Sequence, residues 1–146
     1  MSKNMHSLTN PQKSIWQTGE FYKGTSIENI SGRATILEKV DFKNFEKAIN
    51  LFIEKNDSFR LKFVIDKTEV KQYVEDYKEF SFEKVNVSSE KDVKKIEDEL
   101  SNYVFDVLNS YLFKFVLYEF CELLSLDLHG HNISTYLLAL LSNLIL

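Results

Sequence analysis

The chain is poor in the residues that mark disulfide-linked and multidomain proteins. Its 146 residues include one cysteine, one proline and four glycines. The single cysteine, Cys121, cannot form an internal disulfide, and Pro11 alone cannot make a proline-rich linker. At this length and without a linker, the sequence predicts one domain.

The chain also lacks an apolar run long enough to cross a bilayer. Residues Met1–Asn10 are polar and do not contain the apolar core of a signal peptide. The apolar run Tyr136–Leu146 has eleven residues, whereas a membrane-spanning helix needs about 20. We therefore expect Tyr136–Leu146 to form a buried helix, and the protein to be cytoplasmic without membrane contact.

An excess of positive charge is absent as well. The chain has 18 Lys and Arg residues against 22 Asp and Glu residues, interleaved along the sequence, and a formal net charge of −4. This pattern does not create the basic surface that attracts nucleic acid, so nucleic acid is excluded as a partner. Apolar residues are abundant instead, at 44% of the chain with 14% aromatic, which is enough to bury a core.

The periodicity of these apolar residues predicts an α/β fold of the α+β type. Spacings of three and four residues predict helices, and strict alternation predicts strands. In chain order, we expect a helix over Gln12–Phe21 capped by Asn10, a strand over Ser31–Val40, a helix after the N-cap Asp41 with apolar positions from Phe42 to Ile53, a hairpin of Phe59–Ile65 and Val70–Val74, a strand over Phe80–Val87, a helix opened by Ser88-Ser89-Glu90 and running to Val104, and a strand over Leu112–Phe120.

Three segments carry motifs in a recognisable order. In Leu8–Trp16 a proline precedes a glutamine and an aromatic residue closes the segment. Lys55–Phe63 contains Arg60 and Phe63 in an Arg-x-x-Phe spacing, and Leu112–Tyr118 is a strand pattern. Together they resemble the first motif, the second motif and the strand before the catalytic histidine motif of nonribosomal peptide synthetase condensation domains. The second motif usually begins Arg-His-Glu, and Lys-Asn-Asp stands there in this chain.

The resemblance implies a fold and a function. The fold is that of chloramphenicol-acetyltransferase-like proteins, in which a mixed sheet is flanked by helices and two such subdomains form a V. The function is amide formation between aminoacyl or peptidyl thioesters on carrier proteins, within a set of synthetase modules. The substrates arrive on phosphopantetheine arms, and no cofactor is bound directly. This chain would correspond to the N-terminal subdomain alone, the second subdomain being absent, and would be inactive in isolation.

The third family motif, His-His-x-x-x-Asp-Gly, is present only in part. If His131 takes the place of the second histidine, Gly130 replaces the first, Thr135 the aspartate and Tyr136 the glycine. By resemblance, His131 is the catalytic candidate, either as a general base or as a group that positions the acceptor amine. A neutral imidazole can accept a proton from an ammonium group or bond to the amine near pH 7.

Arg60 is the structural candidate that the resemblance implies. In the family the arginine of the second motif forms an ion pair with the aspartate of the third. Thr135 cannot supply that charge, so a buried Arg60 would lose a bidentate partner and face a desolvation cost of several kcal/mol. The alternative is that Arg60 makes a surface pair that contributes little to stability.

Residues 119–146 form an atypical end. Glu119–Asp127 contains no Gly, Asn or Pro, where the family has a turn between two strands, and no Lys or Arg follows Lys114. We therefore hypothesise that a frameshift or a truncation altered this part of a single partial condensation domain, residues 1–146.

Other interpretations of these residues remain open. His129 and His131 can be an exposed pair at a strand end; a metal site would need a third ligand, and the sequence places none nearby. The aromatic residues of the first helix, Trp16 and Phe21 with Ile15, fit a packed helix face better than a substrate platform. Cys121 lacks a cationic neighbour that would make it a nucleophile.

Two other functions also remain open. One is a related acyltransferase that uses coenzyme A thioesters, which would share the fold and the histidine. The other is a noncatalytic remnant or a carrier-protein-docking fragment, an interpretation that Gly130 and Thr135 favour.

Overall fold

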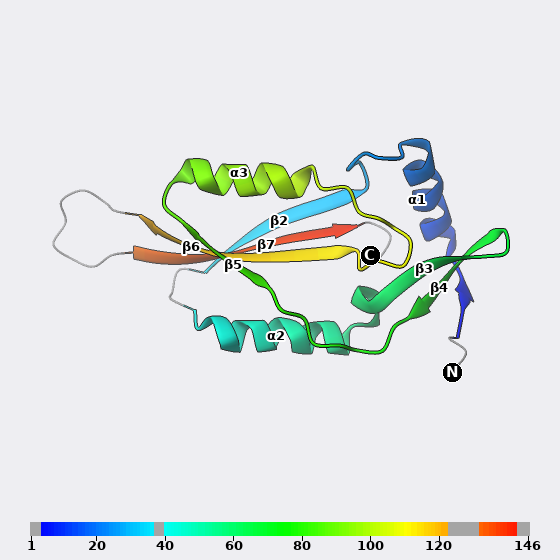
Figure 1. Ribbon diagram of the computed structural model, residues 1–146, viewed down its shortest axis with the longest axis horizontal. Coiled ribbons are helices and arrows are strands. Elements are labelled where there is room, and N and C mark those ends of the chain that lie inside the picture. The colour runs from blue at the N-terminus through cyan, green and yellow to red at the C-terminus, as the bar shows by residue number, and fades with distance from the viewer. Residues whose placement is uncertain (1–3, 37–39, 123–131, 143–146) are drawn as a thin grey trace.

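The computed structural model describes residues 4–36, 40–122 and 132–142, with side chains described as far as Glu119. Both helices and strands are distributed along the chain (Figure 1). The elements are β1 (His6–Ser7), α1 (Asn10–Phe21), β2 (Asn29–Ile36), α2 (Phe42–Lys55), the short 3₁₀ helix η1 (Asp57–Arg60), β3 (Leu61–Asp66), β4 (Glu69–Val74), β5 (Glu83–Val87), α3 (Glu90–Ser101), β6 (Phe113–Glu122) and β7 (Asn132–Ser142).

A mixed sheet forms the centre of the molecule. Its strand order is β2-β7-β6-β5, and β5 runs parallel to β6 while the other neighbours are antiparallel. Parallel neighbours need a crossover connection, and α3 provides it between β5 and β6. The sequence prediction of a mixed sheet flanked by helices is confirmed.

Helices α2 and α3 run along opposite faces of this sheet (Figure 1). Phe113 of β6 belongs to the same buried cluster as Ile49 and Ile53 of α2, and Phe115 packs against that cluster. The alternate positions of β6, Val116 and Tyr118, belong instead to the cluster of α3. Because side chains alternate along a strand, β6 supplies the core of both layers.

A smaller antiparallel sheet lies beside the first, in the order β1-β4-β3. The predicted hairpin is confirmed as β3 and β4, with Lys67 at a φ of 60° in the turn between them. Its first strand begins at Leu61 instead of Phe59, because Asp57–Arg60 forms the 3₁₀ helix η1. Phe59 is buried there and belongs to the same apolar cluster as Ile53 of α2 and Phe63 of β3.

The helix starts follow side-chain capping. Asp41 caps α2 as predicted, its Oδ1 accepting the backbone N–H of Asn44 at 2.8 Å. The predicted cap of the first helix, Asn10, is wrong by one residue: Thr9 is the N-cap, and its backbone N–H donates to the side chain of Gln12 at 2.9 Å. A Thr with Gln three residues later forms a capping box, which Asn10 could not form with Lys13.

The predicted helix over Tyr136–Leu146 is wrong over the residues that the structure describes. Residues as far as Ser142 belong to β7, which is paired on one side with β2 and on the other with β6. The run Tyr136–Leu146 lacks the alternation of a half-buried strand, and a short apolar run of this kind fits a buried strand as well as a buried helix.

The remaining boundaries differ from the predictions for local reasons. The strand expected over Phe80–Val87 begins at Glu83, because the backbone N–H and C=O of Phe80 bond to the side chain of Asn50, each at 2.8 Å. The third helix ends at Ser101, where the Asn102 side chain bonds to the carbonyl of Asp98. The first predicted strand is β2, which ends at Ile36, followed by the undescribed residues 37–39.

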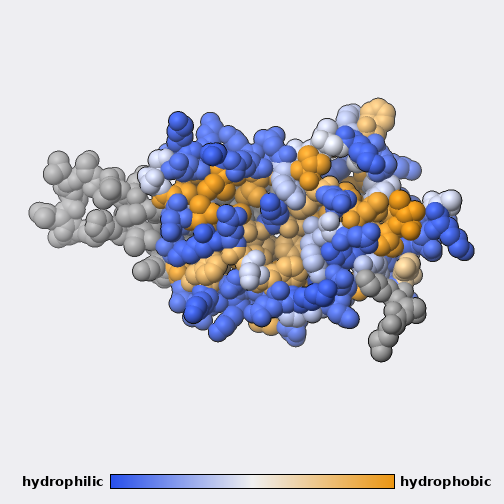
Figure 2. Space-filling model, in the orientation of Figure 1, coloured by the Kyte–Doolittle hydropathy of each residue, from blue (hydrophilic) through white to orange (hydrophobic). Residues whose placement is uncertain are grey.

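Charged and polar side chains cover the outer sides of α2 and α3, and apolar surface is visible between the two helices (Figure 2). Among the described residues, no helix has both the length and the apolar character needed to cross a membrane.

Candidate functional site

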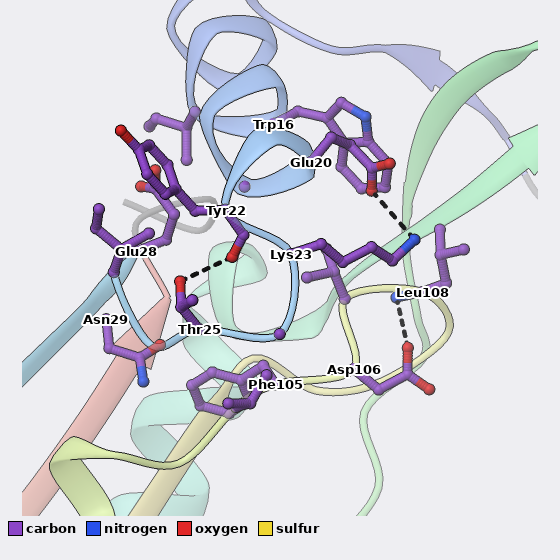
Figure 3. Close-up of a pocket in the computed structure, with 16 residues that line it drawn as sticks. Trp16, Glu20, Tyr22, Lys23, Thr25, Glu28, Asn29, Phe105, Asp106 and Leu108 are labelled. Atoms are coloured by element: carbon purple, nitrogen blue, oxygen red, sulfur yellow. Dashed lines mark hydrogen bonds and ion pairs between the residues drawn. The ribbon is translucent and has the colours of Figure 1, made fainter.

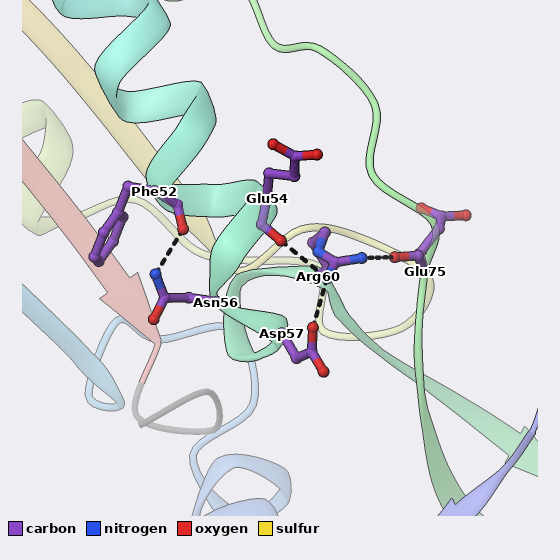
Figure 4. Close-up of polar contacts among 6 residues, drawn as sticks. All are labelled: Phe52, Glu54, Asn56, Asp57, Arg60 and Glu75. Atoms are coloured by element: carbon purple, nitrogen blue, oxygen red, sulfur yellow. Dashed lines mark hydrogen bonds and ion pairs between the residues drawn. The ribbon is translucent and has the colours of Figure 1, made fainter.

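Arg60, the structural candidate of the second motif, stands where the helical layer turns into the hairpin (Figure 4). Asn56 ends α2 and begins η1, and its Nδ2 donates to the carbonyl of Phe52 at 2.6 Å. Arg60 is the last residue of η1, and this single turn brings its side chain close to the last residues of α2. The position of Arg60 therefore depends on the cap at Asn56.

The guanidinium of Arg60 binds three oxygens from three parts of the chain (Figure 4). Its Nη1 donates to the carbonyl of Glu75 at 2.9 Å, and its Nη2 donates to the carbonyl of Glu54 at 3.2 Å. Nη2 also pairs with the carboxylate of Asp57. Arg60 thereby ties the end of α2 to the segment that follows β4.

Arg60 is mostly buried, since 14% of its side chain is exposed. The ion-pair partner of Arg60 is largely in solvent, so the alternative of a pair that contributes little to stability stays open. Within the described part of the chain, its Nε has no hydrogen-bond partner. Asp57, which is 72% exposed, supplies the carboxylate in this structure from the third position of the same motif.

Thr135, the residue at the place of the family's aspartate, does not lie beside Arg60. The ring of Phe59, next to Arg60, is 5.6 Å from that of Phe113 at the start of β6. Thr135 pairs with Glu119, six residues further along β6 and about 20 Å away at the usual rise of a strand. The two positions therefore lie toward opposite ends of the sheet.

The catalytic candidate His131 lies outside the described residues, as does His129. The residue after it, Asn132, is the first of β7 and pairs with Glu122 at the end of β6. In chain order His131 thus precedes β7. Its prediction as a catalytic group is not tested by the structure.

A buried charged cluster that the sequence analysis did not single out adjoins Arg60. Lys62 is 6% exposed, and its Nζ donates to the carbonyl of Asn109 at 3.1 Å and lies 3.3 Å from the ring centroid of Tyr111. Its Nζ is also 3.9 Å from the carboxylate of Glu75. Lys62 is buried because the segment before β6, with Asn109 and Tyr111, covers this side of β3.

The hydroxyl of Tyr111 completes this cluster by donating to Oε2 of Glu75 at 2.7 Å. Burial and this hydrogen bond raise the pKa of Tyr111 to about 12. The phenol is therefore neutral at ordinary pH and serves as a donor. The arrangement of Arg60, Lys62, Glu75 and Tyr111 is suited to holding the hairpin against the sheet; it presents no nucleophile.

A cavity of about 330 Å³ opens beside the first motif (Figure 3). It is lined by the second half of α1, the turn that follows it and the segment before β6, with Ile15, Trp16, Gly19, Glu20, Tyr22, Lys23, Gly24, Thr25, Ile27, Glu28, Asn29, Val104, Phe105, Asp106, Val107 and Leu108. Most of the lining is apolar. The sequence predicted no cavity, because segments far apart in the chain form its walls.

The predicted packed face of the first helix is confirmed in part. Ile15 and Trp16 pack against the main apolar cluster. Phe21 does not, since 81% of it is exposed. The apolar spacing of α1 therefore predicted correctly that Ile15 and Trp16 contact the core, but the last turn of the helix, with Phe21, lies outside it.

These features define the class of the protein. A mixed sheet between two helices, with an arginine-centred turn after the second helix, is the chloramphenicol-acetyltransferase-like fold expected from the sequence. The chain belongs to the condensation-domain family, whose sequence profile matches residues 2–129.

Similar proteins agree with this assignment. A segment of 81 residues is 37% identical to surfactin synthase subunit 1 of Bacillus subtilis (strain 168), covering 53% of this chain and 2% of that protein. A double mutant of the starter condensation domain of rhizomide synthetase has a similar fold, with a TM-score of 0.80 at 14% identity over 97% of this chain. The X-domain from teicoplanin biosynthesis gives 0.75 at 16% identity over 99%.

The chain spans only a part of these relatives. It covers 33% of the rhizomide synthetase domain and 29% of the X-domain, in addition to the small fraction of surfactin synthase subunit 1. The fold described above therefore corresponds to about a third of the solved condensation domains.

Proposed function

We propose that this chain supplies the N-terminal subdomain of a condensation domain that joins two carrier-protein-bound thioester substrates by an amide bond. The observation that carries the proposal is the family match over residues 2–129. Similarity to surfactin synthase subunit 1 supports a place in a modular synthetase of the cytoplasm, with carrier proteins as partners and their phosphopantetheine arms as tethers.

In this proposal residues 1–146 are a single partial domain whose residues 119–146 depart from the family pattern. His131 is its one candidate for proton transfer to or from the acceptor amine. In this chain His131 precedes β7, whereas the resemblance implies a histidine motif that follows two paired strands. An altered reading frame in this region would account for the difference, and the nucleotide sequence of the locus tests it.

The proposed subdomain should not catalyse condensation by itself. A channel formed between two subdomains has only half of its walls in this chain, so the reacting groups are neither oriented nor shielded from water. Purified chain mixed with a donor acyl-carrier protein and an acceptor aminoacyl-carrier protein should yield no amide above a protein-free control, as measured by mass spectrometry. Amide formation above that control would contradict the proposal of an inactive half.

Binding of carrier proteins separates the proposal from its alternatives. We expect a loaded carrier protein to bind the chain in a calorimetric titration, and the variant His131→Ala to bind equally well, since docking does not require the imidazole. A condensation domain of rhizomide synthetase has been solved with C8-CoA and Leu-SNAC, so acyl-coenzyme A is the matched competitor. Binding of acyl-coenzyme A without any binding of carrier protein would favour a coenzyme A-dependent acyltransferase instead.

A further inference from the structure

The cavity beside α1 has the composition of a ligand site. Its volume of about 330 Å³ falls at the lower end of the range for small-molecule pockets, and apolar side chains form most of its wall. Three of the large apolar residues that line it remain well exposed: Tyr22 at 46%, Ile27 at 54% and Val104 at 44%. Aromatic side chains from α1 and from the segment before β6 surround the space (Figure 3).

The charges around the cavity favour a cation. Three carboxylates line it, those of Glu20, Glu28 and Asp106, against the single ammonium of Lys23. Lys23 lies 3.8 Å from Glu20, so it balances one carboxylate and leaves an excess of two negative charges. Opposite charge around a partly enclosed site attracts a ligand and excludes ligands of the same sign.

The end of α1 adds to this preference. The residues from Gly19 to Thr25 belong to the last turn of α1 and the turn after it, and the last turn of the helix contains no basic residue. The C-terminal end of a helix carries partial negative charge on its free carbonyls. Aromatic rings such as those of Trp16 and Phe105 can in addition bind a cation over their faces.

We propose that this cavity binds a small organic ammonium ion with an aromatic or aliphatic body. The apolar wall takes the body of the ligand, and the carboxylates with the helix end take the ammonium group. The proposal goes beyond acyl transfer and does not depend on it. The cavity shares no residue with the cluster of Arg60, Lys62, Glu75 and Tyr111.

The single tryptophan of the chain makes the proposal testable, because Trp16 lines the cavity and no other tryptophan contributes to the fluorescence. Titration with phenethylamine should change the fluorescence saturably. The anion 3-phenylpropionate, which carries a carboxylate on the same phenylethyl body, should bind at least about tenfold more weakly, which corresponds to about 1.4 kcal/mol. Equal binding of the amine and the anion, or no saturable change with the amine, would overturn the proposal.

Two kinds of variant connect the signal to the cavity. Gly19→Leu places a side chain in the space, and the helix accepts it because a Cβ at Gly19 meets only Cγ of Glu28, at 3.9 Å. We expect this variant to keep its helical circular dichroism and to lose the saturable change. Asp106→Asn keeps an oxygen for the N–H of Leu108 while removing the charge, so it should weaken amine binding about fivefold.

A remote carboxylate provides the matched control. Glu99 lies on α3, outside the cavity lining, and Glu99→Gln removes the same charge from the protein as a whole. Its affinity for phenethylamine should equal that of the unmodified chain. An equal loss in Glu99→Gln and Asp106→Asn would assign the effect to net charge and overturn the site.

Discussion

Arg60 is the residue on which the turn between α2 and the hairpin depends. Replacing it with alanine removes the donors to the carbonyls of Glu54 and Glu75 and leaves both carbonyls without these bonds. Because hydrogen bonds to charged groups are the stronger kind, we expect Arg60→Ala to lower the free energy of unfolding by about 3 kcal/mol. Urea denaturation measures the change.

The control for Arg60 is its exposed partner. Asp57→Asn retains an oxygen that can accept from Nη2, and Asp57 is largely in solvent. The free energy of unfolding of this variant should therefore be close to that of the unmodified chain. A loss for Asp57→Asn as large as that for Arg60→Ala would mean that the ion pair, and not the bonds to the main chain, holds the turn.

The raised pKa of Tyr111 predicts that the stability of the fold depends on pH in the alkaline range. Its pKa is about 12 in the folded chain, against an ordinary value of 10, so the folded state holds the phenol proton more tightly than the unfolded state. The contribution of this group to stability is therefore complete below pH 10 and is lost as the pH rises toward 12. Urea midpoints compared between the unmodified chain and Tyr111→Phe should show a smaller decline in the variant over that interval.

Some features of the site around Arg60 are visible in the sequence, and others are not. The resemblance of the second motif drew attention to Arg60 and Phe63, and Phe63 is fully buried. The partners of Arg60 are mostly main-chain carbonyls, and a carbonyl gives no signal in the sequence. Lys62 was missed because the segment that buries it is 47 residues away along the chain.

At the scale of elements, the start of α3 offers a direct test of capping. Ser89 is the N-cap, and its Oγ accepts the backbone N–H of Asp92 at 3.2 Å. Ser89→Ala should lower the free energy of unfolding by about 1 kcal/mol. The adjacent Ser88→Ala is the matched control, because Ser88 bonds to the side chain of Asp92 but caps no backbone group in the same way.

The two variants also differ in the expected effect of acid. The side-chain hydrogen bond from Ser89 is the main cause that lowers the pKa of Asp92 below its ordinary value. A lowered pKa stabilises the fold above the ordinary value, and this contribution is lost as the pH falls through the folded pKa. Acid titration of stability should therefore show a weaker decline in Ser89→Ala than in Ser88→Ala. Identical acid profiles would contradict this.

Elements with one buried face were the ones that sequence periodicity described well. Helix α2 was predicted with its cap because Phe45, Ile49 and Ile53 recur on one side and Asp41 precedes them. The part of β7 from Tyr136 onward was predicted as a helix because this apolar run shows no alternation in the sequence. Local sequence preference is enough to predict α2, whereas β7 is a strand because it pairs with β2 and β6.

For the molecule as a whole, the edge strand β2 of the central sheet is open to solvent along most of its length. On β2, Ser31 and Arg33 bond to α3 through Ser101 and Glu97. The apolar side chain at the alternate position, Ile30, is 44% exposed. Apolar surface of this kind binds environment-sensitive dyes.

We expect Ile30→Thr to reduce the fluorescence of a bound naphthalene sulfonate dye. Threonine keeps the β-branched shape that suits a strand while removing apolar area. Ile65→Thr is the matched control, since Ile65 is 58% exposed but lies near the tip of the hairpin. An equal reduction in both variants would show that single exposed residues, and not the sheet edge, bind the dye.

The register of the central sheet has a consequence for synthesis. Strand β2 has β7 as its only partner within the described sheet, and Asn29 pairs with Ser142. During synthesis on the ribosome, β2 therefore stays unpaired until the residues of β7 have emerged, while α2, β3 and β4 can associate earlier. The first strand of this sheet to be made is thus paired only after β7, and β7 is also the strand that joins β2 to β6 and β5.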